Sequence, residues 1–172
     1  VVVLGSSEGS WIEADLRQHE LQVHFLDKGA GFGAKTIPRL ARLLRRLRPD
    51  VVHTHLHVLK YTVAARPLSR RCVPVVHTVH NLAQHEAEGL DRHLSRVVFR
   101  RGVVPVAIGG EVARSLRSTY GIEPRFTVPN GIVVAEFAAR PGVGAAVRET
   151  LGVTSKVPIV ITAGRLNTQK NH

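Results

Sequence analysis

Short apolar segments recur along the chain, and most of the gaps between them fit helices. The segments are rich in valine, isoleucine and leucine, as buried strands are. They occupy residues 1–4, 21–26, 51–55, 73–79, 103–108, 126–128 and 157–162. Apolar strands that alternate with helices predict an α/β fold, with a parallel sheet covered by helices on both faces. Such sheets bind ligands at the carboxyl ends of their strands, so the residues after each segment are candidates for a binding site.

The stretch from 132 to 156 is rich in turn-forming residues and divides the segments into two groups. It contains Pro141, Gly142, Gly144 and Gly152, although residues 145–151 also fit a short helix. We expect a first domain over 1–131, a connection over 132–156 and the start of a second domain over 157–172. Because an apolar segment begins at residue 1 and the chain has no methionine, we expect the fold to be truncated at both ends.

Composition is that of an ordinary α/β protein, with 44% hydrophobic and 5% aromatic residues among 172. No apolar run approaches the roughly 18 residues that span a bilayer, so a cytoplasmic location is the expectation. The formal charge of +11 favours phosphate-bearing partners, whether nucleic acid, anionic lipid or a nucleotide.

Part of this charge lies in an amphipathic segment. Arginines at 39, 42, 45, 46 and 48 are interleaved with leucines at helical spacing. The pattern predicts a helix whose basic face is solvated. The alternative is a peripheral contact of that face with an anionic membrane surface.

Histidines follow two of the predicted strands. His53, His55 and His57 alternate and would share a face if the strand continued through them, and His77 and His80 lie at the end of the next strand. No cysteine or carboxylate accompanies them on these strands, so a cleft lined with polar side chains is favoured over a metal cluster. We predict no metal site.

The segment VVHTVHN, residues 75–81, places His80 and Asn81 at the carboxyl end of a strand. An imidazole in this position can hydrogen-bond a sugar hydroxyl or assist proton transfer. The alternative is a histidine that merely packs at a strand-to-helix turn.

The glycine-rich segment GAGFGAK, residues 29–35, lies between a strand and a helix. In a P-loop the lysine directly follows the last glycine, whereas Ala34 intervenes here. We therefore interpret the segment as an ordinary loop.

The closing segment AGRLNTQKNH, residues 163–172, follows the last apolar segment and places Arg165 and Lys170 just beyond Gly164. A strand, a glycine and two cations before a helix can present positive charge and backbone amides to a phosphate. The alternative is a pair of solvated cations.

Four of these segments occur in the order seen in family 4 of the glycosyltransferases, which the chain resembles over almost its whole length. They are PDVVHTH at 49–55, HTVHN at 77–81, VPNGI at 128–132 followed by Phe137, and the closing AGRLNTQKNH. Members are retaining enzymes of the GT-B fold, with two Rossmann-like domains and the active site between them. The resemblance implies that residues 1–131 belong to the acceptor-side domain and that the donor-side domain begins at 157.

The resemblance also implies roles for individual residues. Arg165 and Lys170, with Gly164, match the group that holds the donor diphosphate, and His80 matches a histidine near the transferred sugar. Asn81, Asn130 and Gly131 are assigned to the acceptor side or the cleft. The implied reaction transfers a sugar from a nucleotide-sugar donor to an acceptor with retention of configuration, and needs no cofactor. The chain alone is expected to be inactive, because the paired-glutamate motif of the family's donor domain has no counterpart in it.

Three alternatives remain open. A sugar-nucleotide epimerase or a phosphorylase would share the GT-B fold. A non-catalytic basic module would bind nucleic acid or membrane instead, but the sequence has no aromatic stacking platform and no recognised nucleic-acid motif. We therefore expect no nucleic-acid partner.

Overall fold

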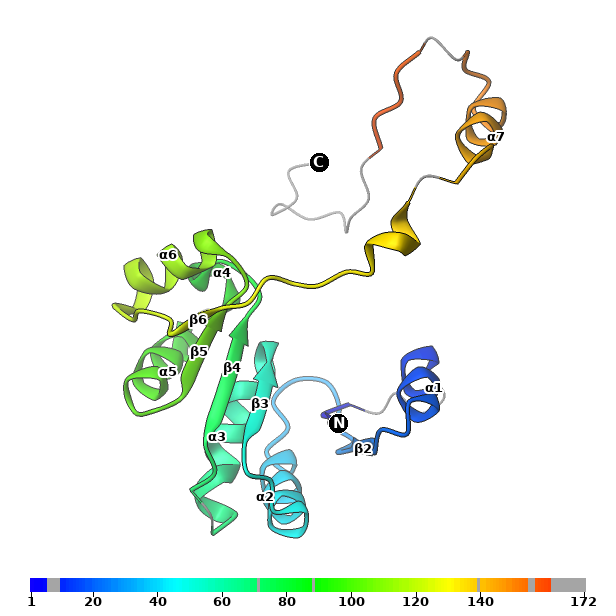
Figure 1. Cartoon of the computed structure of the whole chain (residues 1–172). Helices are drawn as coiled ribbons and strands as arrows, with labels where there is room; N and C mark the ends of the chain where they lie inside the picture. The colour runs from blue at the N-terminus through cyan, green and yellow to red at the C-terminus, as the bar shows by residue number, and fades with distance from the viewer. Residues whose placement is uncertain (6–9, 71, 88, 139, 155–156, 162–172) are drawn as a thin grey trace. The chain divides into compact units, whose positions relative to one another are not determined.

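The computed structural model divides the chain into two compact units, Val1–Asn130 and Gly131–His172 (Figure 1). It describes residues 1–5, 10–70, 72–87, 89–138, 140–154 and 157–161. No helix in these ranges combines the length and the apolar character needed to cross a membrane.

The first unit is built on parallel strands, which confirms the predicted fold class. Strands β3 (Val52–His55), β4 (Val75–Val79), β5 (Val104–Ala107) and β6 (Phe126–Thr127) form one sheet in that order. Strands β1 (Val2–Val3) and β2 (His24–Phe25) form a separate parallel pair, where the sequence had predicted a single sheet. Each strand lies within its apolar segment and is shorter than it, because apolar residues continue into the flanking turns.

Helices connect the strands. They are α1 (Trp11–Gln18), α2 (Thr36–Leu47), α3 (Leu59–Leu68), α4 (Ala83–Glu86), α5 (Gly89–Arg100) and α6 (Gly110–Tyr120). The Ser10 hydroxyl caps α1 by accepting from the Glu13 N–H. Helix α6 ends at Gly121, whose φ of 67° is the left-handed conformation that glycine adopts without a steric penalty.

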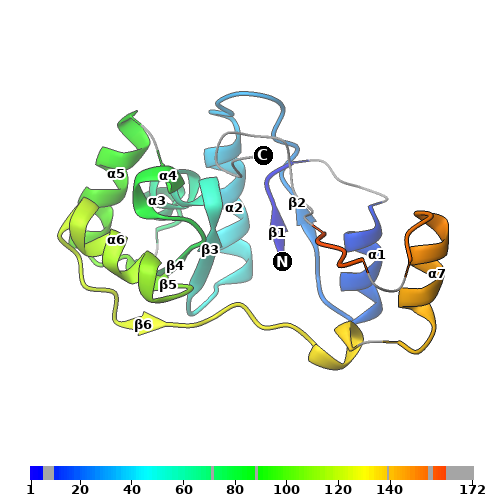
Figure 2. The same cartoon turned by 90° about the horizontal axis from the view of Figure 1, so that it is seen from above.

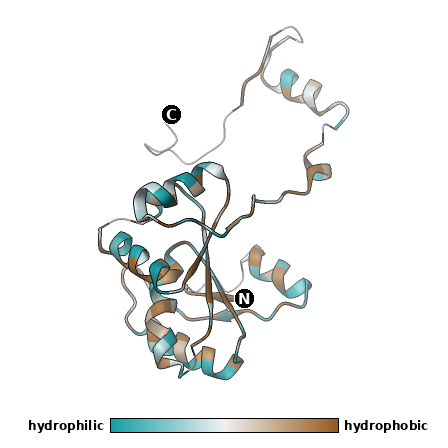
Figure 3. Ribbon diagram, turned by 60° about the vertical axis from the view of Figure 1, so that its left-hand side comes forward, coloured by the Kyte–Doolittle hydropathy of each residue, from teal (hydrophilic) through white to brown (hydrophobic). Residues whose placement is uncertain are grey.

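Two groups of buried side chains hold the first unit together. One joins β4 and β5 to α5 and α6, and it includes Val79, Phe99 and Leu116. The other joins α2 to α3 around Tyr61, and residues of the β1–β2 pair pack against it. Figure 3 shows the same division of polarity, with mostly hydrophobic central strands and helices of mixed character.

Helix α2 is the amphipathic helix that the arginine spacing predicts. It buries Leu40, Leu43 and Leu44, and the five arginines are exposed. Both overall views place α2 beside β3 (Figures 1 and 2). The Arg39 guanidinium donates to the Leu26 carbonyl at 2.8 Å, which ties α2 to the end of β2.

The second unit has little regular structure. It contains a 3₁₀ turn, η2 (Val134–Phe137), and helix α7 (Val143–Thr150), and none of its described residues is buried. The prediction of a strand over 157–162 is wrong for 157–161, which are irregular. A strand is stabilised by pairing with its neighbours, and the described part of this unit offers none.

Candidate functional site

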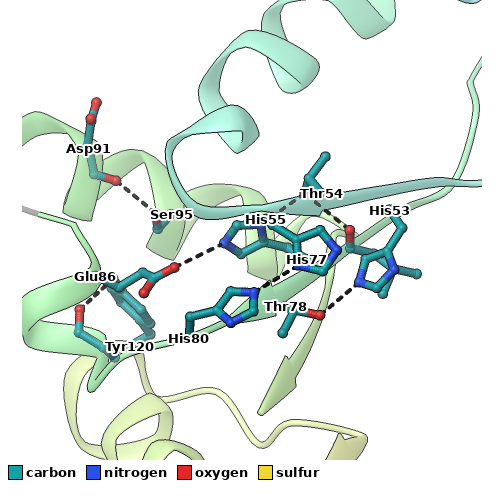
Figure 4. A network of polar contacts seen from close by, with 12 residues as sticks. His53, Thr54, His55, His77, Thr78, His80, Glu86, Asp91, Ser95 and Tyr120 are labelled. Atoms are coloured by element: carbon teal, nitrogen blue, oxygen red, sulfur yellow. Dashed lines mark hydrogen bonds and ion pairs between the residues drawn. The ribbon is translucent and has the colours of Figure 1, made fainter. Parts of the chain in front are cut away.

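The histidines gather at the carboxyl ends of β3 and β4, as Figure 4 shows. The two strands are parallel neighbours, with His55 opposite Thr78 in the register. His53 and His55 therefore project from one strand beside the residues that end the other, and His80 follows β4 directly. Strand β3 ends at His55 and a 3₁₀ turn, η1 (Leu56–Val58), begins, so the predicted face shared with His57 does not form.

His80 meets His55 across the two strand ends. The distance between His55 Nδ1 and His80 Nε2 is 2.8 Å, and the ring centroids are 5.1 Å apart. At this separation only one of the two nitrogens carries a hydrogen, which it donates to the other. Burial lowers the pKa of His55, and the neighbouring His53 and His80 lower it further. The arrangement is suited to passing a proton between an exposed ring and a half-buried one.

His77 lies beneath this pair on the covered face of the sheet and is 2% exposed. Its ring packs against Phe99, with 6.0 Å between centroids, and its Nδ1 lies 2.9 Å from the Thr54 hydroxyl. Burial, reinforced by the other histidines, lowers the pKa of His77 to about 4. The imidazole is therefore neutral near pH 7.

Glu86, the last residue of α4, approaches His77 from the other side. Its Oε1 atom is 3.9 Å from His77 Nε2, and only 10% of its side chain is exposed. Burial raises the pKa of this carboxyl, although hydrogen bonds from the backbone N–H groups of His80 and Asn81 act in the opposite direction. Oε1 is buried and has no hydrogen-bond partner among the described residues.

A cavity of about 850 Å³ lies against the histidines. Its wall includes Leu4, Phe32 and Tyr61, and Lys28 and Lys60 each lie near the Tyr61 ring, at 5.9 and 6.0 Å from its centroid. His55 and Glu86 also line it. Its volume lies in the range of small-molecule binding sites. The glycine-rich segment 29–35 is a loop, as predicted, and it contributes Phe32 to this wall.

The structure describes only some of the predicted site residues. The structure brings His80 and Asn81 together at the end of β4, both half-buried. Asn130 and Gly131 are exposed on either side of the boundary between the two units. Gly164, Arg165 and Lys170 lie outside the described residues. No group of three or more potential ligands that could hold a metal occurs within the described ranges.

Sequence reasoning missed Glu86 as a member of the site. Its position six residues after His80 became informative only with the structure, because a four-residue helix folds its carboxyl group back onto the turn. The single weak signal was an acid placed soon after the VHN segment.

Known proteins with similar sequences belong to one family of glycosyltransferases. The sequence model of the family described as Glycosyltransferase Family 4 matches residues 1–136. The D-inositol 3-phosphate glycosyltransferases of Geodermatophilus obscurus and Acidothermus cellulolyticus are each 35% identical to the chain over 133 residues. The match covers 70% of this chain and 29% of each relative, so the chain spans less than a third of their length.

Solved structures show the same fold. Anabaena HepE, determined in complex with UDP and glucose, matches with a TM-score of 0.66 and 17% identity over 88% of this chain and 42% of its own. The UDP-N-acetylglucosamine 2-epimerase of Rickettsia bellii matches with a TM-score of 0.50 and 16% identity over 89% of this chain and 43% of its own. At these identities the likeness concerns the fold, which is of the GT-B type.

Proposed function

Because the chain belongs to Glycosyltransferase Family 4, we propose that it is part of a retaining glycosyltransferase that uses a nucleotide-sugar donor. Residues 1–131 supply the acceptor-side domain in this proposal, and the donor-side domain begins at 157. The observation that carries it is the family match over residues 1–136, which spans the histidine site at the carboxyl ends of β3 and β4.

The proposed chemistry divides between the two parts. Arg165 and Lys170, with the backbone at Gly164, bind the donor diphosphate and stabilise the negative charge that develops as the sugar leaves. His80 lies beside the transferred sugar and hydrogen-bonds one of its hydroxyls. An oxygen of the departing diphosphate accepts the acceptor's proton on the same face of the sugar, which gives retention. No step in this scheme requires a metal ion or a cofactor.

The acceptor binds on the side of the first unit in this proposal. The relatives that match this part of the chain are named as transferases to D-inositol 3-phosphate, and a phosphorylated polyol is the acceptor class that we favour. The cavity beside His55 supports this choice because Lys28 brings positive charge to it, whereas Lys60 is paired with Asp91 in the same wall. Asn81, Asn130 and Gly131 provide amide groups for the acceptor or the cleft.

The test is sugar transfer by the protein that carries this chain. Replacing His80 with alanine is expected to lower kcat about a hundredfold or more, in the range typical of a lost acid–base or polar catalytic group. The double variant Arg165→Ala, Lys170→Ala is expected to raise the donor KM and lower kcat together. His19→Ala, an exposed histidine of the first unit, serves as control. Unchanged turnover and donor affinity in the double variant would contradict the donor assignment.

The rival activities make different predictions in the same assay. An epimerase would convert the sugar nucleotide without an acceptor, and a phosphorylase would consume phosphate. A non-catalytic basic module would bind DNA or anionic vesicles in a salt-sensitive way and would not bind sugar nucleotides.

Peripheral membrane contact is a separate part of the proposal. It is supported by the exposed arginines of α2, of which Arg42, Arg45 and Arg46 lie within the helix and face solvent. Each basic residue near an anionic surface contributes roughly 1 kcal/mol of attraction. Replacing these three with glutamate is expected to abolish co-sedimentation with anionic vesicles. Equal sedimentation of variant and parent would refute the contact.

A further inference from the structure

The neutral His77 ring has a defined tautomer, because Thr54 determines which nitrogen carries the hydrogen. The Thr54 hydroxyl donates its one hydrogen to the Val76 carbonyl at 3.2 Å. Thr54 Oγ1 must then accept from His77, whose Nδ1 lies 2.9 Å away. His77 therefore carries its hydrogen on Nδ1, and the lone pair of Nε2 points toward Glu86.

An ionised Glu86 would leave two acceptors facing each other. Its Oε1 lies 3.9 Å from His77 Nε2, is buried, and has no hydrogen-bond partner within the described part of the chain. Unpaired acceptors in a buried site are costly, whereas one proton on the carboxyl gives Nε2 a donor and removes a buried charge. The opposite pKa shifts of the two groups, raised for Glu86 and lowered for His77, agree with this distribution of the proton.

Glu86 also controls the turn that carries His80. The backbone N–H groups of His80 and Asn81 both hydrogen-bond its carboxyl group. The helix that bears Glu86 is fixed at its first residue, Ala83, which is fully buried. The N–H of Ala83 donates to the Ser115 hydroxyl at 2.9 Å, and its carbonyl accepts from the Tyr120 hydroxyl at 3.1 Å. Helix α6 thus holds α4 in place, and Glu86 at the end of α4 holds the His80–Asn81 turn.

We propose that Glu86 is a positioning residue for His80: in its acid form it turns its proton toward His77 Nε2 while its carboxyl group anchors the His80–Asn81 turn. The inference rests on the proposed role of His80 in sugar transfer. Glu86 does not touch the reacting groups in this account. It acts by holding the His80 ring against the His55 ring at the carboxyl ends of β3 and β4.

Glutamine is the discriminating substitution. In Glu86→Gln the amide oxygen can accept the two backbone N–H groups, and the amide nitrogen can donate to His77 Nε2 whatever the pH. We expect kcat within about twofold of the parent. Glu86→Ala removes both functions, and kcat is expected to fall about tenfold or more while the donor KM changes little, because orientation rather than binding is lost.

Two further variants separate positioning from stability. Glu86→Leu keeps the buried volume but leaves the facing polar groups without a partner, so its Tm should fall no further than that of Glu86→Ala while turnover is lost as in alanine. Glu111→Ala, at an exposed position whose side chain is 83% accessible, should alter neither. Parent-like turnover in the alanine or leucine variant, or a loss in the glutamine variant as large as in alanine, would overturn the proposal.

A spectroscopic readout distinguishes this inference from the proposed function. Long-range ¹H–¹⁵N spectra at pH 7 should show His77 as the neutral Nδ1–H tautomer in the parent and in Glu86→Gln, and Glu86→Ala should shift the His80 ring signals. An imidazolium or an Nε2–H tautomer at His77 would overturn the inference. If His80→Ala leaves turnover unchanged while the spectra are as expected, the proposed function fails and the positioning geometry stands.

Discussion

Replacing Tyr120 with phenylalanine tests how α6 holds the helix that bears Glu86. Tyr120 is 2% exposed, and its hydroxyl donates to the Ala83 carbonyl at 3.1 Å in a fully buried setting. The substitution keeps the ring, its edge-on contact with Phe99 and its buried apolar area, so only the contacts of the hydroxyl group change. A buried carbonyl that loses its donor where water cannot enter costs about 1–3 kcal/mol. We expect that loss in the free energy of unfolding.

The assay is urea unfolding of the chain followed by circular dichroism, with the slope m held common to parent and variants. Tyr61→Phe is a matched control, since Tyr61 is also 2% exposed. Its hydroxyl accepts from the Gly33 N–H at 3.2 Å in a half-buried loop, where water can replace it. The control should lose less than about 1 kcal/mol. Equal losses in the two variants, or no loss in Tyr120→Phe, would refute the reasoning.

Three other predictions concern packing, titration and backbone conformation. Leu116→Ala, at a fully buried position, should lower the free energy of unfolding by about 2–5 kcal/mol. Leu90→Ala, at a position that is 88% exposed, should lower it by less than about 1 kcal/mol in the same measurement. In Glu86→Gln, the lowered pKa of His77, about 4 when folded and 6.5 when unfolded, should give stability that is complete above pH 6.5 and falls by on the order of 3 kcal/mol toward pH 4. The parent should show a shallower pH dependence of urea midpoints, because the raised pKa of Glu86 contributes stability that is present at low pH and lost as pH rises; identical slopes would contradict this. Gly121→Ala should lower the thermal midpoint through a loss of about 1 kcal/mol, because the φ of 67° disfavours a side chain there, and an unchanged midpoint would exclude this strain.

The sequence predicted the parallel α/β class because its signal is repeated: six apolar segments of the first unit each contain a strand. It also predicted α2 correctly, since arginine and leucine alternate there at a helical period. Strand ends were harder to predict. The histidine alternation at 53, 55 and 57 continues past the point where the backbone turns into a 3₁₀ helix, and side-chain spacing carries no information about that turn.

Site residues that directly follow a strand could be predicted from the sequence, whereas residues placed by tertiary contacts could not. His80 and Asn81 are adjacent to an obvious strand, so their place at the sheet edge followed from topology alone. The role proposed for Glu86 depends on its buried approach to His77 and on the hydrogen bonds that hold Ala83 to α6, which join residues up to 37 positions apart. The predicted donor residues lie outside the described ranges and remain predictions.

The most direct test of the central claim is the anomeric configuration of the first product made by the protein that carries this chain. The protein would be incubated with nucleotide-sugar donors and inositol phosphate, and the anomeric proton coupling of the glycoside product would be recorded by NMR. The account predicts a glycoside with the configuration of the donor, formed only when the acceptor is present and formed about a hundredfold or more slowly in His80→Ala. An inverted product, or conversion of the donor sugar without an acceptor, would contradict it.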